Sequence, residues 1–203
     1  MAGRRALVLG ASGLVGSRCV AHLQASDAYE LVTCLVRRPI LSDRAGSRET
    51  RATQPEKVRE RVVDLSKLTG DDVEPYDDLF CAIGTTMKKA GSREAFRWVD
   101  HDLPLRVAEL GVGRGTKRIA LVSSAGASAR SSNFYLRTKG ELEEALARLP
   151  LDALHILRPS LLLGERSESR PGEAIASVVA RATRGLLVGS LRKWRPIDGD
   201  RVA

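Results

Sequence analysis

Aromatic residues, cysteines and long apolar runs are all scarce in this sequence of 203 residues. Phe, Trp and Tyr make up only 4% of the chain, which argues against the stacking surfaces of single-strand nucleic-acid binders. The cysteines, Cys19, Cys34 and Cys81, are odd in number and lie in separate apolar segments. Neither a disulfide framework nor a metal site is therefore predicted, and the three histidines add no ligand-like spacing. The apolar runs are too short for a transmembrane helix, so we expect no membrane segment.

The first residues and the overall charge bear on where the protein works and what it binds. Residues 1–9, MAGRRALVL, begin like a signal peptide, but the apolar part ends at Gly10 and no cleavage pattern follows. Together with cysteines that suggest no disulfide framework, this predicts a cytoplasmic protein. The net charge of +8 attracts phosphate groups of a nucleotide or of a nucleic acid. Because no recognition motif for DNA or RNA is present, we expect no specific nucleic-acid partner.

Short apolar runs that alternate with helix-like stretches predict the fold. The apolar runs cover residues 6–9, 31–36, 61–65, 79–83, 119–123 and 153–157. The helix-like stretches cover residues 14–25, 93–110 and 134–149. Nearly continuous apolar strands between helices are typical of a parallel sheet covered on both faces. We therefore predict a single domain over residues 1–203, of α/β class, with a doubly wound parallel sheet of the Rossmann type.

Three polar segments interrupt this pattern. Residues 39–60 contain few apolar side chains and are expected to form a mobile loop. Residues 164–174 lead into a predicted helix over 172–184. In the last segment, RKWRPIDGDRVA, Asp200 could cap a following helix, but too few residues remain after it to form one. The end of the sequence therefore looks cut short. The part beyond about residue 160 is expected to form a minimal substrate region.

Three glycines follow the first predicted strand in ALVLGASGLVGSRCVAHL. Gly10, Gly13 and Gly16 have the spacing that lets a chain turn, approach a pyrophosphate closely and pack a helix against a strand. The start of the following helix would supply N–H donors and positive potential. This position in the first strand–helix turn favours dinucleotide binding over a merely structural tight turn.

Basic residues stand where the second predicted strand ends, in LVTCLVRRP. An acidic side chain commonly binds the ribose 2′-hydroxyl of NAD at this place, whereas Arg37 and Arg38 suit the 2′-phosphate of NADP. We favour NADP over NAD, although arginines can also simply solvate a strand end. Asp64, after the third predicted strand, is expected to bond the adenine amino group unless it is only a surface carboxylate.

The fifth predicted strand delivers Ser123 and Ser124 to the sheet edge where ligands bind, and Tyr135 and Lys139 follow on a helix. Residues four apart share a helix face, so the phenol and the ammonium can meet. A phenol with an ordinary pKa of about 10 becomes a usable proton donor or acceptor when nearby positive charge favours phenolate. A serine hydroxyl could then hold the substrate oxygen. The alternative is a solvated helix face.

These motifs, in this order, resemble the short-chain dehydrogenase/reductase superfamily in its extended or atypical branch. The segments CAIGTTMKKAGSREAFRWVDHDLPLRVAEL, LVSSAGASARSSNFYLRTKGELE and RPSLLLGERSESRPGE are similar to the family of the human Tat-interacting protein. That family comprises NADPH-binding oxidoreductase-like proteins and bacterial relatives described as nucleoside-diphosphate-sugar epimerase-like. The similarity runs from Leu7 to about Ala174.

The resemblance implies roles for individual residues. Those implied to wrap the pyrophosphate are Gly10, Ser12, Gly13 and Leu14. Arg37 and Arg38 would hold the 2′-phosphate. The residues implied to line the cofactor near the nicotinamide ribose are Ile83, Gly84 and Thr85, while Leu162 and Arg170 would close over it. Tyr135 would be the acid/base, Lys139 its partner and a ligand of the ribose hydroxyls, and Ser124 the substrate-orienting hydroxyl ahead of Ser123.

Two departures from the family pattern leave the function open. The superfamily frequently has Asn where WVDHD places Asp100, which puts a proton-relay role there in doubt. The region after the sixth predicted strand is small for a sugar-nucleotide pocket. We expect an NADP-dependent oxidoreductase acting on a small carbonyl or alcohol. The alternatives are an NADPH-binding regulatory protein with a protein partner and an epimerase-like enzyme. The oligomeric state is open.

Overall fold

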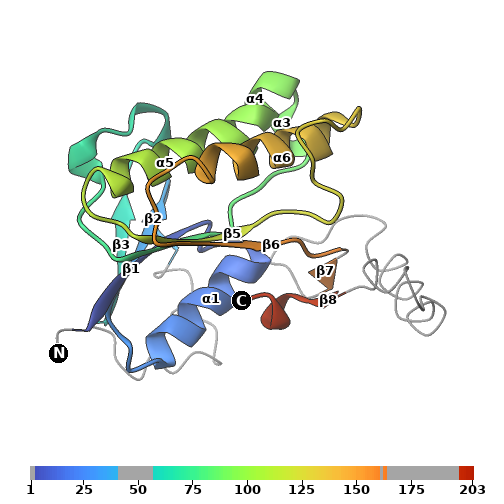
Figure 1. Cartoon of the computed structure of the whole chain (residues 1–203). Coiled ribbons are helices and arrows are strands. Elements are labelled where there is room, and N and C mark those ends of the chain that lie inside the picture. Colours follow the sequence, from blue (N-terminus) through green and yellow to red (C-terminus); the bar gives the residue numbers. More distant parts are fainter. Residues whose placement is uncertain (1–2, 41–56, 161, 164–196) are drawn as a thin grey trace.

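The computed structural model describes residues 3–40, 57–160, 162–163 and 197–203. Its centre is a six-stranded parallel sheet between layers of helices (Figure 1). The strand order is β3-β2-β1-β4-β5-β6. The strands are β1 (Arg4–Leu9), β2 (Tyr29–Val36), β3 (Val58–Val62), β4 (Asp78–Cys81), β5 (Arg118–Val122) and β6 (Ala153–Leu157). The predicted α/β class with a doubly wound, Rossmann-type sheet is confirmed.

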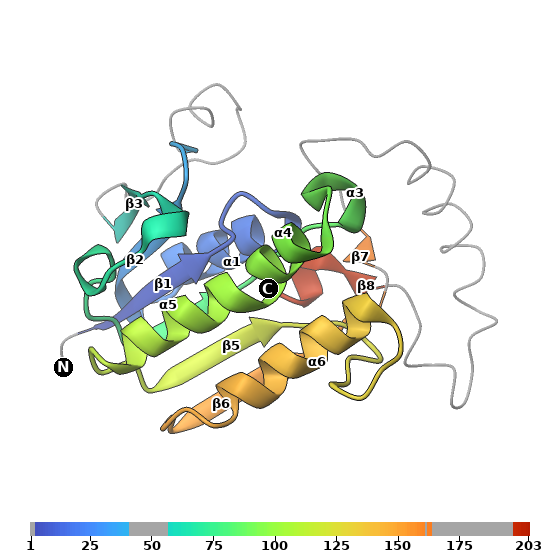
Figure 2. The same ribbon diagram turned by 90° about the horizontal axis from the view of Figure 1, so that it is seen from above.

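Helices cover both faces of the sheet because successive strand residues point to opposite sides. Helix α1 (Leu14–Ala25) lies on one face, and α5 (Leu103–Val112) and α6 (Phe134–Leu146) lie side by side on the other (Figures 1 and 2). On the α1 face, Val8 and Val32 are buried with Val20. On the other face, the buried cluster includes Leu9, Leu79, Leu121, Val107 and Leu142. The two apolar layers fix the sheet between its helices.

Most predicted elements are confirmed. Helix α1 has the predicted bounds, and the strands at residues 6–9, 31–36, 79–83 and 119–123 differ from the prediction by one or two residues at their ends. The third strand is shifted: β3 spans Val58–Val62 and pairs with Val32–Val36 of β2. The expectation of a loop over all of residues 39–60 is therefore wrong for Val58 to Glu60, while residues 41–56 lie outside the described part.

The predicted helix over residues 93–110 is divided by a change of hydrogen-bond register. It consists of α4 (Arg93–Arg97), a π-helical turn at Trp98–Asp102 and α5. Pro104 has no N–H to donate to the carbonyl four residues earlier, and just before it Leu103 N donates to Trp98 O, five residues back. The extra residue in this turn brings Asp100 and His101 into buried positions.

Shorter elements complete the described chain. The 3-10 turns η2 (Leu65–Lys67) and η3 (Gly70–Asp72) connect β3 to β4, and α3 (Met87–Ala90) follows β4. The short strands β7 (Leu162–Leu163) and β8 (Ile197–Asp198) pair in parallel, followed by the turn η6 (Gly199–Arg201). The helix predicted over 172–184 lies outside the described residues. Within the described ranges, no helix is long and apolar enough to cross a membrane.

The last residues pack on α1. Gly199 approaches Leu14 so closely that an added Cβ would lie 2.9 Å from Leu14 Cγ. Asp200, expected to be a helix cap, lies within η6. Its Oδ1 lies 3.7 Å from Arg18 Nη1 and 3.5 Å from His22 Nε2 of α1. This turn brings the end of the chain to the beginning of α1.

Candidate functional site

The three glycines form a tight turn between β1 and α1. Gly10 has φ +96°, a left-handed conformation that favours glycine, and a Cβ there would lie 2.6 Å from Ala82 C and Ile83 N after β4. Gly13 N donates to Gly10 O at 2.9 Å. A Cβ on Gly16 would lie only 2.1 Å from the same oxygen. The turn therefore closes against β4 on one side and α1 on the other.

The beginning of α1 suits an anionic ligand. Gly13 is its N-cap residue, no side chain caps it, and the first turn contains no acidic residue. The N–H groups of a first helical turn have no partner within the helix, and the helix dipole makes this end positive. Ser12 is exposed and Leu14 is half-buried at this end. The first turn of α1 thus offers donors and positive potential beside the glycine turn.

The residues predicted to bind the adenosine half stand at neighbouring strand ends. Arg37 and Arg38 directly follow β2 and are exposed. Asp64 lies two residues after β3 and caps η2, accepting hydrogen bonds from Ser66 Oγ at 2.6 Å and Ser66 N at 3.0 Å. These bonds, the side-chain bond first, lower the pKa of the Asp64 carboxyl below its ordinary range. The adenine role of Asp64 stays a prediction.

Lys139 and Asp100 form a buried ion pair beside the chain segment that follows β4. Lys139 Nζ lies 2.8 Å from Asp100 Oδ1, and the side chains are 5% and 1% exposed. Asp100 Oδ2 accepts the backbone N–H of Thr85 at 2.8 Å. An added Cβ on the exposed Gly84 would lie 3.3 Å from Asp100 Oδ1. The pair therefore lies directly beneath the chain that leaves β4.

Tyr135 lies one helical turn before Lys139, at the surface. Its side chain is 36% exposed, and its ring lies 5.8 Å from that of Phe96. In the described part of the chain, Lys139 Nζ pairs with Asp100, and no hydrogen bond joins it to the Tyr135 hydroxyl. Ser124, half-buried after β5, makes a long hydrogen bond of 3.5 Å to Ala125 O. The catalytic roles of these residues stay predictions.

A second buried charge cluster lies one turn further along α6. Glu143 is 5% exposed and accepts hydrogen bonds from Ser123 Oγ and from the Arg158 guanidinium, whose Nε lies 3.0 Å away. The hydrogen bonds with Glu143 raise the pKa of Arg158. Sequence reasoning missed Glu143, although its i+4 spacing from Lys139 places both on one helix face. Ser123 is bound in this cluster, whereas the one hydrogen bond of the Ser124 hydroxyl within the described residues is the long one to Ala125 O.

The remaining predicted residues are described only in part. Leu162 belongs to β7, which follows β6 along the chain, and Arg170 lies outside the described residues. No group of histidine, cysteine, aspartate and glutamate side chains that could hold a metal occurs among the residues with described positions.

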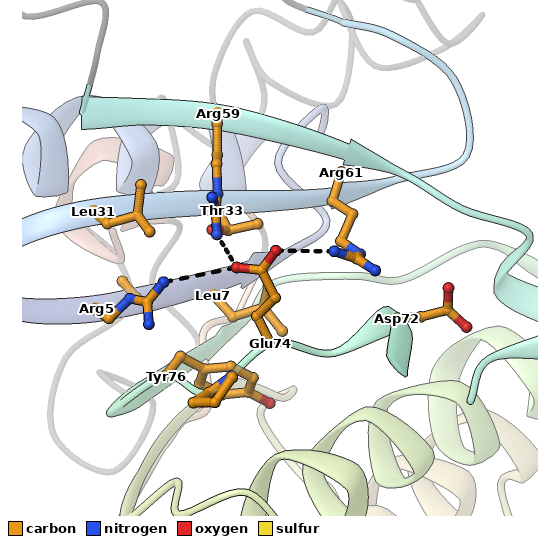
Figure 3. Close-up of a pocket in the computed structure, with 11 residues that line it drawn as sticks. Arg5, Leu7, Leu31, Thr33, Arg59, Arg61, Asp72, Glu74 and Tyr76 are labelled. Atoms are coloured by element: carbon orange, nitrogen blue, oxygen red, sulfur yellow. Dashed lines mark hydrogen bonds and ion pairs between the residues drawn. The ribbon is translucent and has the colours of Figure 1, made fainter. Parts of the chain in front are cut away.

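A small pocket lies near the amino-terminal half of β1 and β2 and is also lined by β3. Figure 3 shows Arg5, Arg59 and Arg61 converging on Glu74, with Arg61 Nη1 2.9 Å from Glu74 Oε1. Its volume of about 10 Å³ is that of one water molecule. Because ligands of open α/β sheets bind at the carboxyl ends of the strands, this pocket lies at the wrong end for a substrate.

A larger groove, of about 500 Å³, lies between η2 and the helix that contains the π turn. Its lining includes Leu65, Trp98 and Leu105. It does not include the glycine turn, Lys139 or Tyr135. Ser66, which donates to Asp64, also lines the groove, so the groove lies next to the predicted adenine-binding residue.

The sheet order and the glycine turn define a protein with the Rossmann-type fold. The family described as HIM1 matches residues 45–188, and the chain belongs to this family. It is 38% identical over 196 residues to Protein FMP52, mitochondrial, of Candida albicans, covering 96% of this chain and 82% of that protein. It is 37% identical over 180 residues to rat Protein HTATIP2, covering 87% and 70%.

Solved structures agree on the fold. MoeE5 in complex with UDP-glucose and NAD has a TM-score of 0.63 and 20% identity, over 88% of this chain. This chain spans only 60% of MoeE5. At such identity the likeness establishes the fold alone.

The comparisons correct one prediction. Several fungal relatives carry the word mitochondrial in their names, including those of Emericella nidulans, Aspergillus niger and Candida glabrata. The expectation of a cytoplasmic protein is contradicted by these names. The physical reason for the error is that cysteines that form no disulfide framework are compatible with any reducing compartment, so they do not single out the cytoplasm.

Proposed function

We propose that the protein is an oxidoreductase that binds NADP(H) and transfers a hydride between the nicotinamide and a small carbonyl or alcohol. The observation that carries this proposal is that the glycine turn and the Lys139–Asp100 pair both lie where β1 and β4 end. The direction of strand order reverses between these two strands, and ligands bind at such switch points. Cofactor and acid–base groups would then share one sheet edge.

The residues at this edge suit a dinucleotide. Gly10 and Gly16 leave no side chain between turn, strand and helix, and the uncapped first turn of α1 provides donors for a pyrophosphate. The residues that would hold the pyrophosphate are Gly10, Ser12, Gly13, Leu14 and Gly16. Ile83, Gly84 and Thr85 would line the nicotinamide ribose, and Leu162 and Arg170 would close over the cofactor.

NADP is the proposed form of the cofactor. The exposed guanidinium groups of Arg37 and Arg38 follow β2, and their planar donors match the geometry of a 2′-phosphate. NAD, which lacks this phosphate, would not benefit from either arginine. Asp64 would bond the adenine amino group from the next strand end.

A bound nicotinamide supplies or accepts the hydride, and the side chains of this protein would manage the proton. During reduction, the Tyr135 phenol would donate a proton to the substrate oxygen, and during oxidation the phenolate would take it back. Ser124 would hold the same oxygen with its hydroxyl. The Lys139 ammonium would favour phenolate through its charge and would bond the ribose hydroxyls.

A second candidate function is an NADPH-binding regulatory protein that has a protein partner and little or no turnover. The pairing of Lys139 with Asp100 favours this alternative, because a neutralised ammonium has less influence on the phenol of Tyr135. A nucleoside-diphosphate-sugar epimerase-like enzyme is a further alternative. Its support is the likeness in fold to MoeE5, whose structure holds UDP-glucose and NAD.

The proposal is tested by following NADPH consumption with a panel of small aldehydes and ketones. Tyr135→Phe should abolish turnover while NADPH affinity stays within about twofold, because the ring contact with Phe96 remains. Tyr29→Phe, on the other side of the sheet, is the matched control and should keep turnover. Unchanged turnover of Tyr135→Phe would refute the mechanism. Tight NADPH binding without turnover of any carbonyl would favour the regulatory candidate.

A further inference from the structure

Three exposed basic side chains lie on the segments that adjoin the proposed acid–base residues. Lys88 belongs to α3, the helix that follows the segment proposed to line the nicotinamide ribose, and Arg93 is the first residue of α4. Arg130 lies in the loop between Ser124 and Tyr135. Within the described residues, no carboxylate lies at ion-pair distance from any of the three.

Most carboxylates of the same region already have partners. Glu141 binds the guanidinium of Arg97, and Asp100 pairs with Lys139 at 2.8 Å. Glu94 accepts its own backbone N–H, and this hydrogen bond lowers the pKa of its carboxyl. Because Glu94 alone stands against the three unpaired basic side chains, this end of α6 keeps an excess of positive charge.

Arg93 combines a restrained position with open donors. Its Cζ lies 5.3 Å from the centre of the Phe134 ring, a cation–π contact. Arg137, 5.9 Å from the same ring, also donates to Ser131 O at 3.0 Å, whereas the guanidinium of Arg93 makes no hydrogen bond to any described residue. A planar fork of donors that rests on a ring is prepared for a carboxylate or a phosphate.

Aromatic rings connect Arg93 to the proposed acid–base residue. Phe134 and Tyr135 both contact Phe96, with ring centres 5.7 and 5.8 Å apart, and Phe96 is fully buried. Phe96 and Arg93 belong to α4, which therefore lies against the beginning of α6 (Figure 2). The open guanidinium stands at the same end of α6 as the phenol.

The proposed cofactor site makes no use of this charge. The pyrophosphate is assigned to the glycine turn, and the 2′-phosphate to Arg37 and Arg38 after β2. A surface with an excess of one charge raises the local concentration of ligands of the opposite charge. The positive charge beside the phenol is therefore available to a substrate.

We propose that the substrate is a carbonyl compound that carries an oxyanion group, a carboxylate or a phosphate, and that Arg93 binds this group. The inference rests on the proposed oxidoreductase function and names its substrate class. The carbonyl carbon would take the hydride from NADPH and the carbonyl oxygen the proton from Tyr135, which gives an alcohol and NADP⁺. The oxyanion group is unchanged, so Arg93 determines specificity through binding.

The test compares two aldehydes of similar size, 4-carboxybenzaldehyde and methyl 4-formylbenzoate, with NADPH as the reductant. We expect the wild type to have a kcat/KM about tenfold or more higher for the carboxylate, the effect of one charge-assisted hydrogen bond. The preference should shrink as sodium chloride is added. Glyceraldehyde 3-phosphate and glyceraldehyde form a second pair, and a preference within one pair alone identifies which oxyanion is bound.

Variants of exposed arginines make the result specific. Arg93→Met keeps an unbranched side chain against Phe134 without the charge, and should raise KM for the preferred anionic aldehyde about tenfold while kcat and the neutral partner change less than about twofold. Arg93→Lys, which keeps the charge without the planar fork, should recover part of this loss.

Arg148→Met is the matched control. Arg148 is exposed and follows the far end of α6, whose 13 residues span about 20 Å. Because this length exceeds the Debye length of about 8 Å at physiological salt, the control should change KM for either aldehyde by less than about twofold.

The outcomes separate this inference from the proposed function. Equal kcat/KM for the charged and the neutral member of both pairs would overturn the anionic substrate class and leave the oxidoreductase function intact. Equal effects of Arg93→Met and Arg148→Met, or an equal loss for charged and neutral aldehydes in Arg93→Met, would overturn the role of Arg93. Wild-type protein that binds NADPH and reduces none of the four aldehydes would count against the oxidoreductase function itself, and against the inference with it.

Discussion

Gly16 offers a direct test of how closely α1 packs on the glycine turn, because two physical effects oppose each other there. Within a helix, replacing glycine by alanine typically stabilises by about 1 kcal/mol through helix propensity. At Gly16, however, an added Cβ would lie 2.1 Å from Gly10 O and 2.7 Å from Gly10 C. Both neighbours are backbone atoms, so no flexible side chain can move aside.

The steric effect should dominate. To accept the methyl group, α1 and the turn would have to separate by about 1 Å, and overpacking of this kind typically costs about 1–3 kcal/mol, occasionally more. Because the contact is between backbone atoms, we expect about 3 kcal/mol, which leaves a net loss of about 2 kcal/mol in the free energy of unfolding. The displaced turn is the proposed pyrophosphate site, so NADPH affinity should fall as well.

Urea unfolding followed by circular dichroism measures this effect. Gly113→Ala is the matched control, because Gly113 has φ −60° and ψ −15° and the nearest atoms to its added Cβ are 3.5 Å away. The control should be as stable as wild type or slightly more stable. A Gly16→Ala variant at least as stable as wild type would refute the close packing of α1 on the turn.

Three other properties of the molecule can be predicted. Asp100→Asn and Lys139→Met should each lower the free energy of unfolding by about 3 kcal/mol, because each leaves a buried charge unpaired. In the same urea assay, the double variant should recover most of this loss. Losses that simply add in the double variant would contradict the ion pair between Asp100 and Lys139. Burial, and secondly a nearby aspartate, raise the pKa of Tyr29 to about 12, so its contribution to stability is complete below pH 10 and is lost between about pH 10 and 12. Tyr29→Phe should flatten this alkaline loss in urea titrations, and an unchanged slope would contradict the assignment. Burial raises the pKa of Cys19 to about 12 and that of Cys81 to about 11. At neutral pH, native protein should therefore react slowly with a disulfide reagent, and urea-unfolded protein should react quickly. Equal rates for the two would contradict the burial of these thiols.

The sheet and its helices were predictable because their side chains follow simple periods. Helix α1 was placed at its observed bounds, since apolar residues recur on one face after a glycine turn. The third strand was misplaced because Val58–Val62 reads VRERV and lies at the edge of the sheet. Its arginines bind Glu74 rather than an apolar layer, so the strand lacks the apolar run by which the others were recognised.

The candidate site was predictable only in part, because its main contact joins distant segments of the chain. Spacing along one helix pointed to a meeting of Tyr135 with Lys139, but the ammonium binds Asp100, which comes from another helix. The helix over 93–110 was predicted as continuous, and Pro104 within it does not by itself say that the preceding turn becomes a π turn. The partners of Glu143, which are Ser123 and Arg158, likewise depend on tertiary packing.

The most direct test of the cofactor site is a calorimetric titration of the purified full chain with NADPH and with NADH. The account predicts one site that binds NADPH about tenfold or more tightly than NADH, and a preference that is lost when Arg37 and Arg38 are both replaced by alanine. Absence of binding by either nucleotide would contradict the account, and an NADH affinity equal to that of NADPH would contradict the role given to the two arginines.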